Sequence, residues 1–217
     1  DEQIGTMPKM EAHEKAVLHR AFSVFIFNSK NELMLQQRAA HKYHSPLLWT
    51  NTCCSHQRVG ESNLQAGSRR LQEEMGFVAP LKETTSFIYK APFDNGLTEH
   101  ELDHIMVGYY EAAPVINPEE VEAWKWMPLE AVKADIQIQP ALYTEWFKIA
   151  IYKIDQCILT VAISAATPTT GGWLQRHPLA PFLVYREEAC DHRVSIVRGG
   201  RAFRHRLTQA RNEQIRQ

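Results

Sequence analysis

Two short stretches hold many of the side chains that could do chemistry. Residues 49–56 are rich in β-favouring types, and the period of two in a strand puts Cys54 and His56 on one face and Cys53 on the other. Residues 99–103 carry a carboxylate at every second position, so in a strand three carboxylates line one face, about 7 Å apart. Like charges in such a row repel unless a cation neutralises them. The pattern indicates a thiol beside an imidazole, and a carboxylate row that needs a positive partner.

A third stretch, residues 61–75, is predicted to be a helix with its charges near the end. Gly60 ends the preceding strand, residues 61–63 supply a capping-type start, and Gly76 is a C-terminal stop. Opposite charges lie one turn apart and so share adjacent faces, namely Arg69, Arg70, Glu73 and Glu74. In an isolated helix, a solvated salt-bridge face would be the preferred interpretation.

The rest of the chain supplies the elements that must position these stretches. Residues 21–27 are predicted to form a buried strand, residues 28–31 a turn and residues 32–38 the returning strand of a hairpin. No internal repeat is present. The other predicted segments are a polar loop at 11–15, strands at 85–89, 105–110 and 121–127, a helix that opens at Pro128, and an amphipathic helix at 143–154.

Length and composition fit one domain, or one domain with an appendage. The chain has 217 residues, 44% of them hydrophobic, which is enough to bury a sizeable core. No apolar run approaches a membrane span and no basic-then-apolar leader opens the sequence, so a cytoplasmic location is expected. Four cysteines are too few for a disulfide framework, and free thiols are expected.

The net charge of −1 hides an asymmetry along the chain. Residues 1–156 hold 15 basic and 21 acidic residues, whereas residues 157–217 hold nine arginines, no lysine and four acidic residues. The shift predicts a boundary, with a domain at 1–156 and an Arg-rich extension of unknown role at 157–217, for which a separate unit, a disordered segment and an unrelated extension all stay open. Within the extension only residues 182–185 and 194–197 have strand patterns. A solvated tail is favoured for the basic run at 198–216, with an acidic partner or nucleic acid as the alternative.

Aligned on Gly76, the charged helix resembles the Nudix box of diphosphate hydrolases. Seven positions match, which are Glu61, Arg69, Leu71, Glu73, Glu74, Gly76 and Phe77. Two positions depart from the motif, because Ser55 replaces its leading glycine and Arg70 replaces its central glutamate. A Nudix hydrolase uses that glutamate, with the later pair, to hold metal ions and activate water. A cation in its place removes hydrolytic metal capacity and adds a phosphate ligand.

Together the motifs resemble one family more specifically, the type 1 isopentenyl-diphosphate isomerases. The resemblance covers roughly residues 4–154, ends near Gln156, and leaves the extension without a counterpart. It implies an α+β fold in which a Nudix-like mixed β-sheet is sandwiched by helices. The residues that carry it are 18–25, 35–38, 50–56, the Nudix-like helix, 99–101 and 146–149.

The resemblance also implies a divalent metal site and an acid/base pair. Mn²⁺ or Zn²⁺, with Mg²⁺ possible, would be bound by three histidines and two glutamates, His13, His19, His56, Glu99 and Glu101. His13 is assigned by its position rather than by a motif. Cys54 would be one acid/base group and Glu101, assisted by Tyr89, the other. Cys53 is interpreted as a small buried residue.

The remaining implied site residues would bind the substrate. Trp146 would stabilise a carbocation through its ring, although helix packing is a close alternative for it. A second ion, Mg²⁺, would bridge the diphosphate and Glu74. The cations implied for the diphosphate are Lys9, Arg38, Lys42 and Arg70, of which the two lysines could equally be solvated loop residues.

The expected function is therefore the reversible isomerisation of isopentenyl to dimethylallyl diphosphate, in isoprenoid biosynthesis. The expected partner is a small prenyl diphosphate, with neither a membrane nor nucleic acid required. A Nudix-type diphosphate hydrolase is the first alternative, and it has no use for Cys54. A non-catalytic binding module that works through the basic tail is the second. Removal of residues 157–217 is expected to leave activity largely unchanged.

Overall fold

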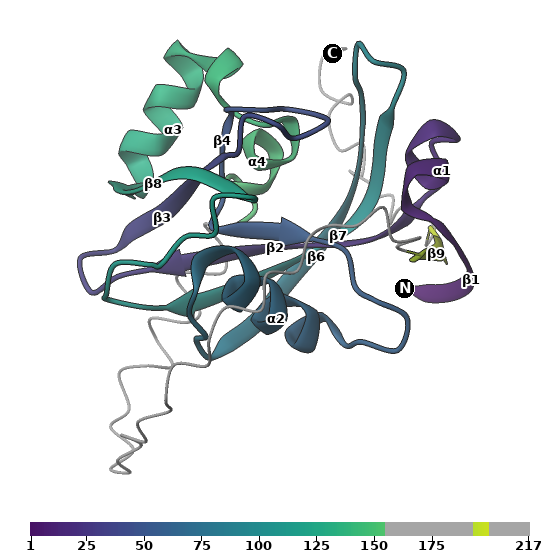
Figure 1. The fold of residues 1–217 in the computed structure, drawn as a ribbon, viewed down its shortest axis with the longest axis horizontal. Helices are drawn as coiled ribbons and strands as arrows, with labels where there is room; N and C mark the ends of the chain where they lie inside the picture. Colours follow the sequence, from purple (N-terminus) through teal and green to yellow (C-terminus); the bar gives the residue numbers. More distant parts are fainter. Residues whose placement is uncertain (155–192, 200–217) are drawn as a thin grey trace, which may run out of the picture.

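A computed structural model describes residues 1–154 and 193–199 of the chain. Figure 1 shows its elements, which are in order β1 (Glu2–Pro8), α1 (Lys9–Glu14), β2 (His19–Phe27), β3 (Glu32–Arg38), β4 (Trp49–Thr50), β5 (Cys53–Ser55), α2 (Asn63–Met75), β6 (Leu81–Pro92), β7 (Thr98–Tyr109), β8 (Val121–Pro128), α3 (Leu129–Ile138), a 3-10 turn (Pro140–Leu142), α4 (Glu145–Ala150) and β9 (Arg193–Arg198). None of the helices in these residues has the length and apolar character that crossing a membrane requires.

One mixed sheet of nine strands organises the described chain. Its central pair is β2 and β7, which run parallel over the whole length of β2. Antiparallel neighbours extend the sheet: β6 pairs with β7, β5 with β2, and β3 with β8 and β4. The N-terminal β1 pairs with β9, which in turn borders β2.

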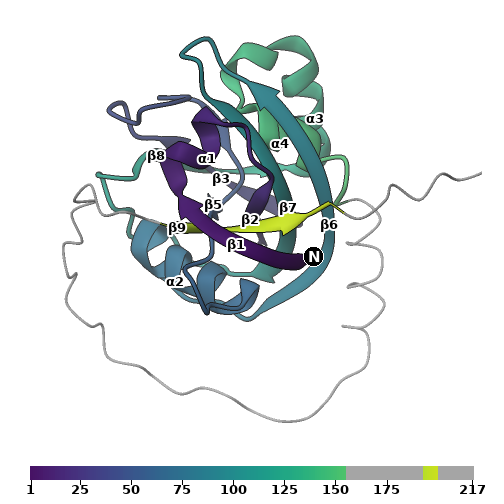
Figure 2. The same ribbon diagram turned by 90° about the vertical axis from the view of Figure 1, so that its right-hand side faces the viewer.

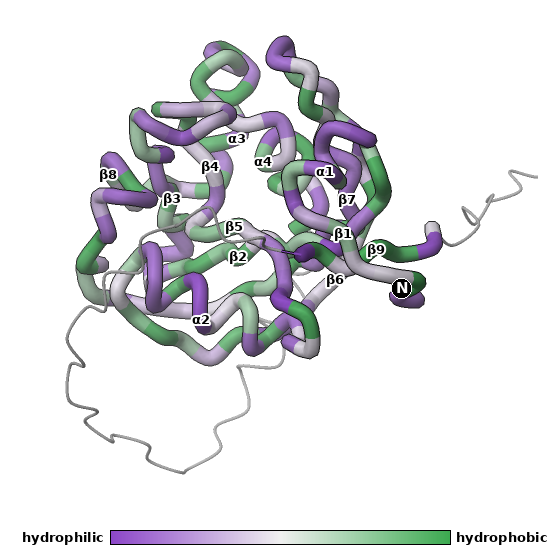
Figure 3. Tube along the Cα trace, turned by 45° about the vertical axis from the view of Figure 1, so that its right-hand side comes forward, coloured by the Kyte–Doolittle hydropathy of each residue, from purple (hydrophilic) through white to green (hydrophobic). Residues whose placement is uncertain are grey.

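Helices cover both faces of the sheet, α2 on one and α3 with α4 on the other (Figures 1 and 2). Alternation along β2 explains the two cores. Phe25 and Phe27 pack with α3 and α4, whereas Phe22, Val24 and Ile26 pack with α2. Because both faces are buried, β2 is apolar almost without interruption, which Figure 3 shows as a green run. The expected α+β sheet between helices is confirmed.

The Nudix-like helix ends at Met75 as predicted and begins at Asn63, two residues later than predicted but within the expected capping segment. Ser62 accepts a hydrogen bond from Gln65 N and the Gln65 side chain accepts one from Ser62 N, which is a reciprocal capping box. Gly76 ends the helix in the left-handed region, with φ of 73°. A Cβ on Gly76 would lie 2.3 Å from Val115 O, so glycine is needed there for space as well as for conformation. The predicted capping segment and stop of this helix are both confirmed.

Three local predictions need correction. Residues 49–56 form two short strands, β4 and β5, because Thr52 turns inward to accept a hydrogen bond from Ile26 N and donate one to Met34 O. Residues 11–14 belong to the short helix α1 instead of a loop, with Ala12 and His13 buried, and Lys15 follows as the C-cap. The helix expected at 143–154 is regular only in α4, over Glu145–Ala150.

Part of the Arg-rich extension belongs to the sheet. The strand predicted at 194–197 exists as β9 and pairs with β1 from Glu2↔Arg198 to Pro8↔Arg193. For these residues the expectation of a disordered or unrelated segment is wrong. The strand predicted at 182–185, the basic run at 198–216 and the cysteines Cys157 and Cys190 lie wholly or mostly outside the described residues.

Candidate active site

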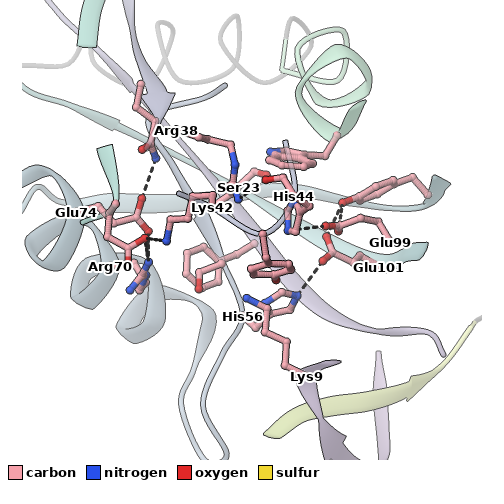
Figure 4. A pocket seen from close by; sticks show the side chains of 18 residues that line it. Lys9, Ser23, Arg38, Lys42, His44, His56, Arg70, Glu74, Glu99 and Glu101 are labelled. Atoms are coloured by element: carbon pink, nitrogen blue, oxygen red, sulfur yellow. Dashed lines mark hydrogen bonds and ion pairs between the residues drawn. The ribbon is translucent and has the colours of Figure 1, made fainter. Parts of the chain in front are cut away.

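A pocket opens between the two helical layers, where β5, the middle of β2 and the start of β7 meet the loop after β3 (Figure 4). Arg70, Glu74 and Lys42 gather at one end of it, and Glu99 and Glu101 at the other. Its lining comes from segments far apart in sequence and includes Lys9, Ser23, Gln36, Arg38, Lys42, Tyr43, His44, Cys54, Ser55, His56, Arg70, Glu74, Tyr89, Glu99, Glu101, Glu120 and Trp146.

Strand register explains why these side chains meet. In the parallel β2–β7 pair, His19 lies opposite Glu101. In the antiparallel β6–β7 pair, Tyr89 lies opposite the same glutamate. On the other side of β2, Cys54 is opposite Ser23. Neighbouring strands are about 4.8 Å apart, so this register sets His19 and Tyr89 directly beside Glu101, whereas Cys54 lies two strands from Glu101 and about four residues further along β2.

Four ligand atoms converge near one end of the pocket, all within 4.8 Å of one another. We call this group, His13, His19, His56 and Glu101, the imidazole end. His19 Nε2 lies 3.2 Å from His56 Nε2, which lies 2.8 Å from Glu101 Oε1. Glu99 is beside the group, with Oε1 3.8 Å from His13 Nε2. The five residues expected to bind a metal are therefore brought together.

The tautomers of two of these histidines suit metal binding. His13 Nδ1 donates to Lys9 O and His19 Nδ1 donates to Val17 O, each at 2.7 Å, because a carbonyl oxygen can only accept. Each Nε2 therefore presents a lone pair to the centre of the group, and His13 Nε2 has no hydrogen-bond partner although it is buried. Burial also lowers the pKa of His13 to about 4 and that of His56 to about 3, which favours neutral rings. Neutral imidazoles with a carboxylate fit a divalent ion.

Glu99 and Glu101 share their surroundings but differ in charge. The Tyr89 hydroxyl lies 2.6 Å from Glu101 Oε2 and 2.9 Å from Glu99 Oε2. Burial and the charge of Glu101 raise the pKa of Glu99 well above its usual range. Burial also acts to raise the pKa of Glu101, but the imidazoles of His19 and His56 hold it well below that range. The pair therefore carries one proton, on Glu99, and Glu101 is ionised.

Adjacent Cys53 and Cys54 lie on opposite faces, as the strand period predicted. Cys53 is fully buried in the α2 core, whereas Cys54 is half-buried and lines the pocket. Burial raises the pKa of the Cys54 thiol, with Arg38 acting in the opposite direction. The thiol is therefore protonated at neutral pH, which is the form that can donate a proton.

The opposite end of the pocket is a network of ion pairs, which we call the guanidinium end. Arg70 Nη2 lies 2.6 Å from Glu74 Oε1 and 3.1 Å from Glu120 Oε2. Lys42 also pairs with Glu120, and Gln36 donates to Glu74 Oε2 at 2.8 Å. Burial acts against the charged form of Arg70, but these carboxylates raise its pKa well above the usual range. Arg70, Lys42 and Glu74 are thus adjacent, as expected.

The other three predicted binding residues reach the same pocket. The guanidinium of Arg38 lies 5.3 Å from the ring centroid of Trp146, which is nine-tenths or more buried in α4. Lys9 Nζ lies 5.6 Å from the ring centroid of Tyr43. Trp146 packs in the core and also lines the pocket, so helix packing and a pocket role are both compatible with its position.

Two pocket residues, His44 and Glu120, were missed by the sequence analysis, and the third carboxylate of the predicted row, Asp103, lies behind Ser23. His44 is stacked on Phe93, and its Nε2 lies 3.6 Å from Glu99 Oε1. Burial lowers the pKa of His44 to about 2, so its ring is neutral. Asp103 accepts a hydrogen bond from Ser23, and burial raises its pKa to about 8. Glu120 belongs to no sequence motif, and only its ion pairs with Lys42 and Arg70 show that it is part of the pocket.

The fold and the α2 helix define the class of protein. The NUDIX domain family matches residues 17–147, more than half of the chain. Among solved structures, the MutT protein from Methanosarcina mazei Go1 aligns with a TM-score of 0.54 at 15% identity, over 65% of this chain and 96% of that one. A protein from Deinococcus radiodurans aligns with a TM-score of 0.53 at 19% identity, over 62% and 82%. At these identities the two structures support the fold alone.

Curated relatives show to which group within the Nudix family the chain is similar. "Isopentenyl-diphosphate Delta-isomerase 2" of Aromatoleum aromaticum is 43% identical over 171 residues, which cover 79% of this chain and 90% of the relative. The protein of the same name from Photorhabdus laumondii is 51% identical over 148 residues, or 68% and 84%. The chain belongs to the isopentenyl-diphosphate Delta-isomerases of the Nudix family. The alignment with the Aromatoleum aromaticum protein covers 171 residues, which is more than the 156 residues of the predicted domain. The sequence similarity is therefore not confined to that domain.

Proposed function

We propose that Cys54 and Glu101 are the acid/base pair with which this chain interconverts isopentenyl and dimethylallyl diphosphate. The reaction adds a proton to the terminal alkene carbon and removes one from the carbon beyond the cationic centre, with no net change in protons, electrons or phosphate. Two groups that exchange protons on opposite sides of the substrate are sufficient. Tyr89 would assist Glu101 through their 2.6 Å hydrogen bond.

The observation that carries this proposal is that Cys54 and Glu101 line one pocket, in surroundings that favour complementary protonation of the two groups. Cys54 holds a proton because burial raises its pKa, and Glu101 is ionised because its neighbours lower its pKa. One group can therefore donate a proton while the other accepts one, and the return reaction uses them with roles reversed. Isomerisation needs such a pair, whereas diphosphate hydrolysis does not need Cys54.

Protonation of the alkene creates a tertiary carbocation, which the pocket must stabilise and shield from water. The ring face of Trp146 attracts a cation and cannot add to it as water would. The neighbouring Arg38 lies 5.3 Å from this ring, so it would bind the diphosphate at the edge of the hydrocarbon site. Because the diphosphate would balance its charge, the Arg38 guanidinium would not compete with the carbocation for the ring face of Trp146.

The guanidinium end is proposed to hold the diphosphate. Arg70 and Lys42 already face Glu74 and Glu120, so phosphate oxygens would replace carboxylates as their partners. A Mg²⁺ ion bound through Glu74 would compensate that carboxylate when the diphosphate arrives. Lys9, together with Arg38, would complete the binding set.

The imidazole end is proposed to hold a second divalent ion, Mn²⁺ or Zn²⁺, with Mg²⁺ as the alternative. Three imidazoles favour the borderline metals over Mg²⁺. When bound, such an ion would neutralise the carboxylate row and hold Glu101 in place. Glu99 would complete the set of ligands from the edge of the group. A cytoplasmic location stays a prediction.

One incubation tests the proposed function. The protein is mixed with isopentenyl diphosphate and Mn²⁺ or Mg²⁺ in D₂O, and deuterium in dimethylallyl diphosphate is followed by NMR while phosphate release is assayed in parallel. Deuterium entry without phosphate release is expected. Release of phosphate without deuterium entry would instead identify a hydrolase.

A further inference from the structure

The C-terminal strand β9 connects the N-terminal strand to the rest of the sheet. Ile196 pairs with Gly5 of β1 on one side and with His19 of β2 on the other, and Val197 N donates to Leu18 O at 3.2 Å. Figure 2 shows β9 lying along β1. In the described part of the chain β1 has no other strand partner, so its place in the sheet depends on β9.

The strand β1 runs directly into α1, the helix that presents His13 and Lys9. Val194 and Ile196 point to one face of β9 and form a small cluster with the fully buried Ala12, one residue before His13. The helix is only six residues long and has no side-chain cap, so by itself it would not be stable. Contact with β9 is therefore a main source of order for α1.

The same strand also reaches the wall of the site. Arg193 and Val194 line a cavity of about 310 Å³ together with Lys9, His56 and Arg70, three residues that also line the reaction pocket. Arg193 Nε donates to Thr6 Oγ1 at 3.2 Å, which fastens the start of β9 to β1. The strand thus touches the site from outside without contributing a metal ligand.

We propose that β9 is a positioning element of the active site, which holds α1 through Val194 and Ile196 so that His13 and Lys9 face the pocket. The inference rests on the metal role given to the imidazole end in the proposed function. It is opposed to the expectation that removal of residues 157–217 leaves activity largely unchanged. A segment near the C-terminus, outside the residues that resemble a Nudix domain, is then required for the first histidine to reach the metal.

The test uses the full chain and two valines of the same strand. Val194 faces the α1 cluster, whereas Val197 is equally buried but alternates to the other face of β9. Apo protein is titrated with Co²⁺ alone and followed by visible absorption, and amide hydrogen exchange is measured in parallel. Val194→Ala and Ile196→Ala should each weaken Co²⁺ binding about tenfold. Amide protection should fall in β1 and α1 while β2 and β7 stay protected.

Val197→Ala removes the same atoms and should bind Co²⁺ like the unaltered protein. Three results would overturn the inference: unchanged Co²⁺ affinity in both Val194→Ala and Ile196→Ala, equal loss in Val197→Ala, or loss of protection throughout the sheet. A different result would count against the proposed function and leave the role of β9 standing. In that case the intact protein binds Co²⁺ tightly, but no deuterium from D₂O enters dimethylallyl diphosphate.

Discussion

The two ends of the pocket solve the problem of buried charge in different ways. At the imidazole end, His13 Nε2 is buried without a hydrogen-bond partner, and the ligand atoms of His13, His19, His56 and Glu101 lie within 4.8 Å of one another, so the group is suited to bind a cation. At the guanidinium end, Arg70 and Lys42 are already paired with Glu74 and Glu120. We expect the imidazole end to bind a cation, whereas a ligand at the guanidinium end must replace internal ion pairs.

The two ends of the pocket should differ in how much binding free energy a ligand gains. A ligand that fills an unsatisfied site contributes its binding free energy to the folded state directly. A ligand that replaces existing ion pairs gains only the difference between two sets of similar interactions. Metal at the imidazole end should therefore stabilise the protein strongly, whereas substrate affinity at the guanidinium end should be moderate and sensitive to small changes.

The largest effect is expected at the acid/base pair, Cys54 in the pocket lining and Glu101 in the imidazole end. Cys54→Ala and Glu101→Gln should each lower the isomerisation rate by about a thousandfold or more, because proton transfer loses its partner. The measurement is turnover of isopentenyl diphosphate, with circular dichroism to verify the fold. Cys53→Ala is the matched control, since this thiol lies on the other face and should leave turnover near normal. Near-normal turnover in Cys54→Ala would contradict the mechanism.

Metal removal should have the next largest effect, and it tests directly how the imidazole end differs from the guanidinium end. Chelation should abolish activity, and restored Mn²⁺ or Zn²⁺ at a hundred times its dissociation constant should raise the free energy of unfolding by about 2.7 kcal/mol. Denaturant unfolding with and without the ion measures this. His56→Ala should lose most of the stabilisation, whereas His41→Ala, an exposed loop histidine, should keep it. Equal stabilisation in both variants would place the ion elsewhere.

Arg70→Gln should have a smaller effect, which appears mainly in KM. Loss of charge-assisted hydrogen bonds to the diphosphate should lower kcat/KM by about tenfold to a hundredfold. Steady-state kinetics at two salt concentrations measures it. Arg20→Gln is the control, because Arg20 makes a surface ion pair with Asp1 away from the pocket. A change in kcat alone, with KM preserved, would argue that Arg70 does not bind substrate.

The smallest effect concerns the support of the guanidinium end. Gly76→Ala should destabilise the protein by about 2 kcal/mol or more, because its positive φ and the clash with Val115 O act together. Gly96→Ala is matched in φ but has open space around the new methyl group, so about 1 kcal/mol is expected. Thermal unfolding compares the two. Equal losses would show that the contact with Val115 is unimportant to the end of α2.

Much of this protein could be predicted from local pattern. The period of two separates Cys53 from Cys54 and puts Glu99 and Glu101 on one face, and the capping box and Gly76 define α2. Periodicity and capping depend on residues a few positions apart, so a single sequence contains the information. The resemblance to known isomerases then supplied His13 as a candidate metal ligand and the cations as candidate diphosphate ligands, which local pattern alone could not assign.

Other features depended on which distant segments pair. The register His19↔Glu101, the approach of His44 to Glu99 and the place of Glu120 beside Arg70 join residues tens of positions apart. The clearest case is β9, whose strand pattern was visible but whose neighbours, β1 and β2, were not. Strand partners are chosen by the packing of the whole sheet, and no local signal in residues 193–198 records that choice.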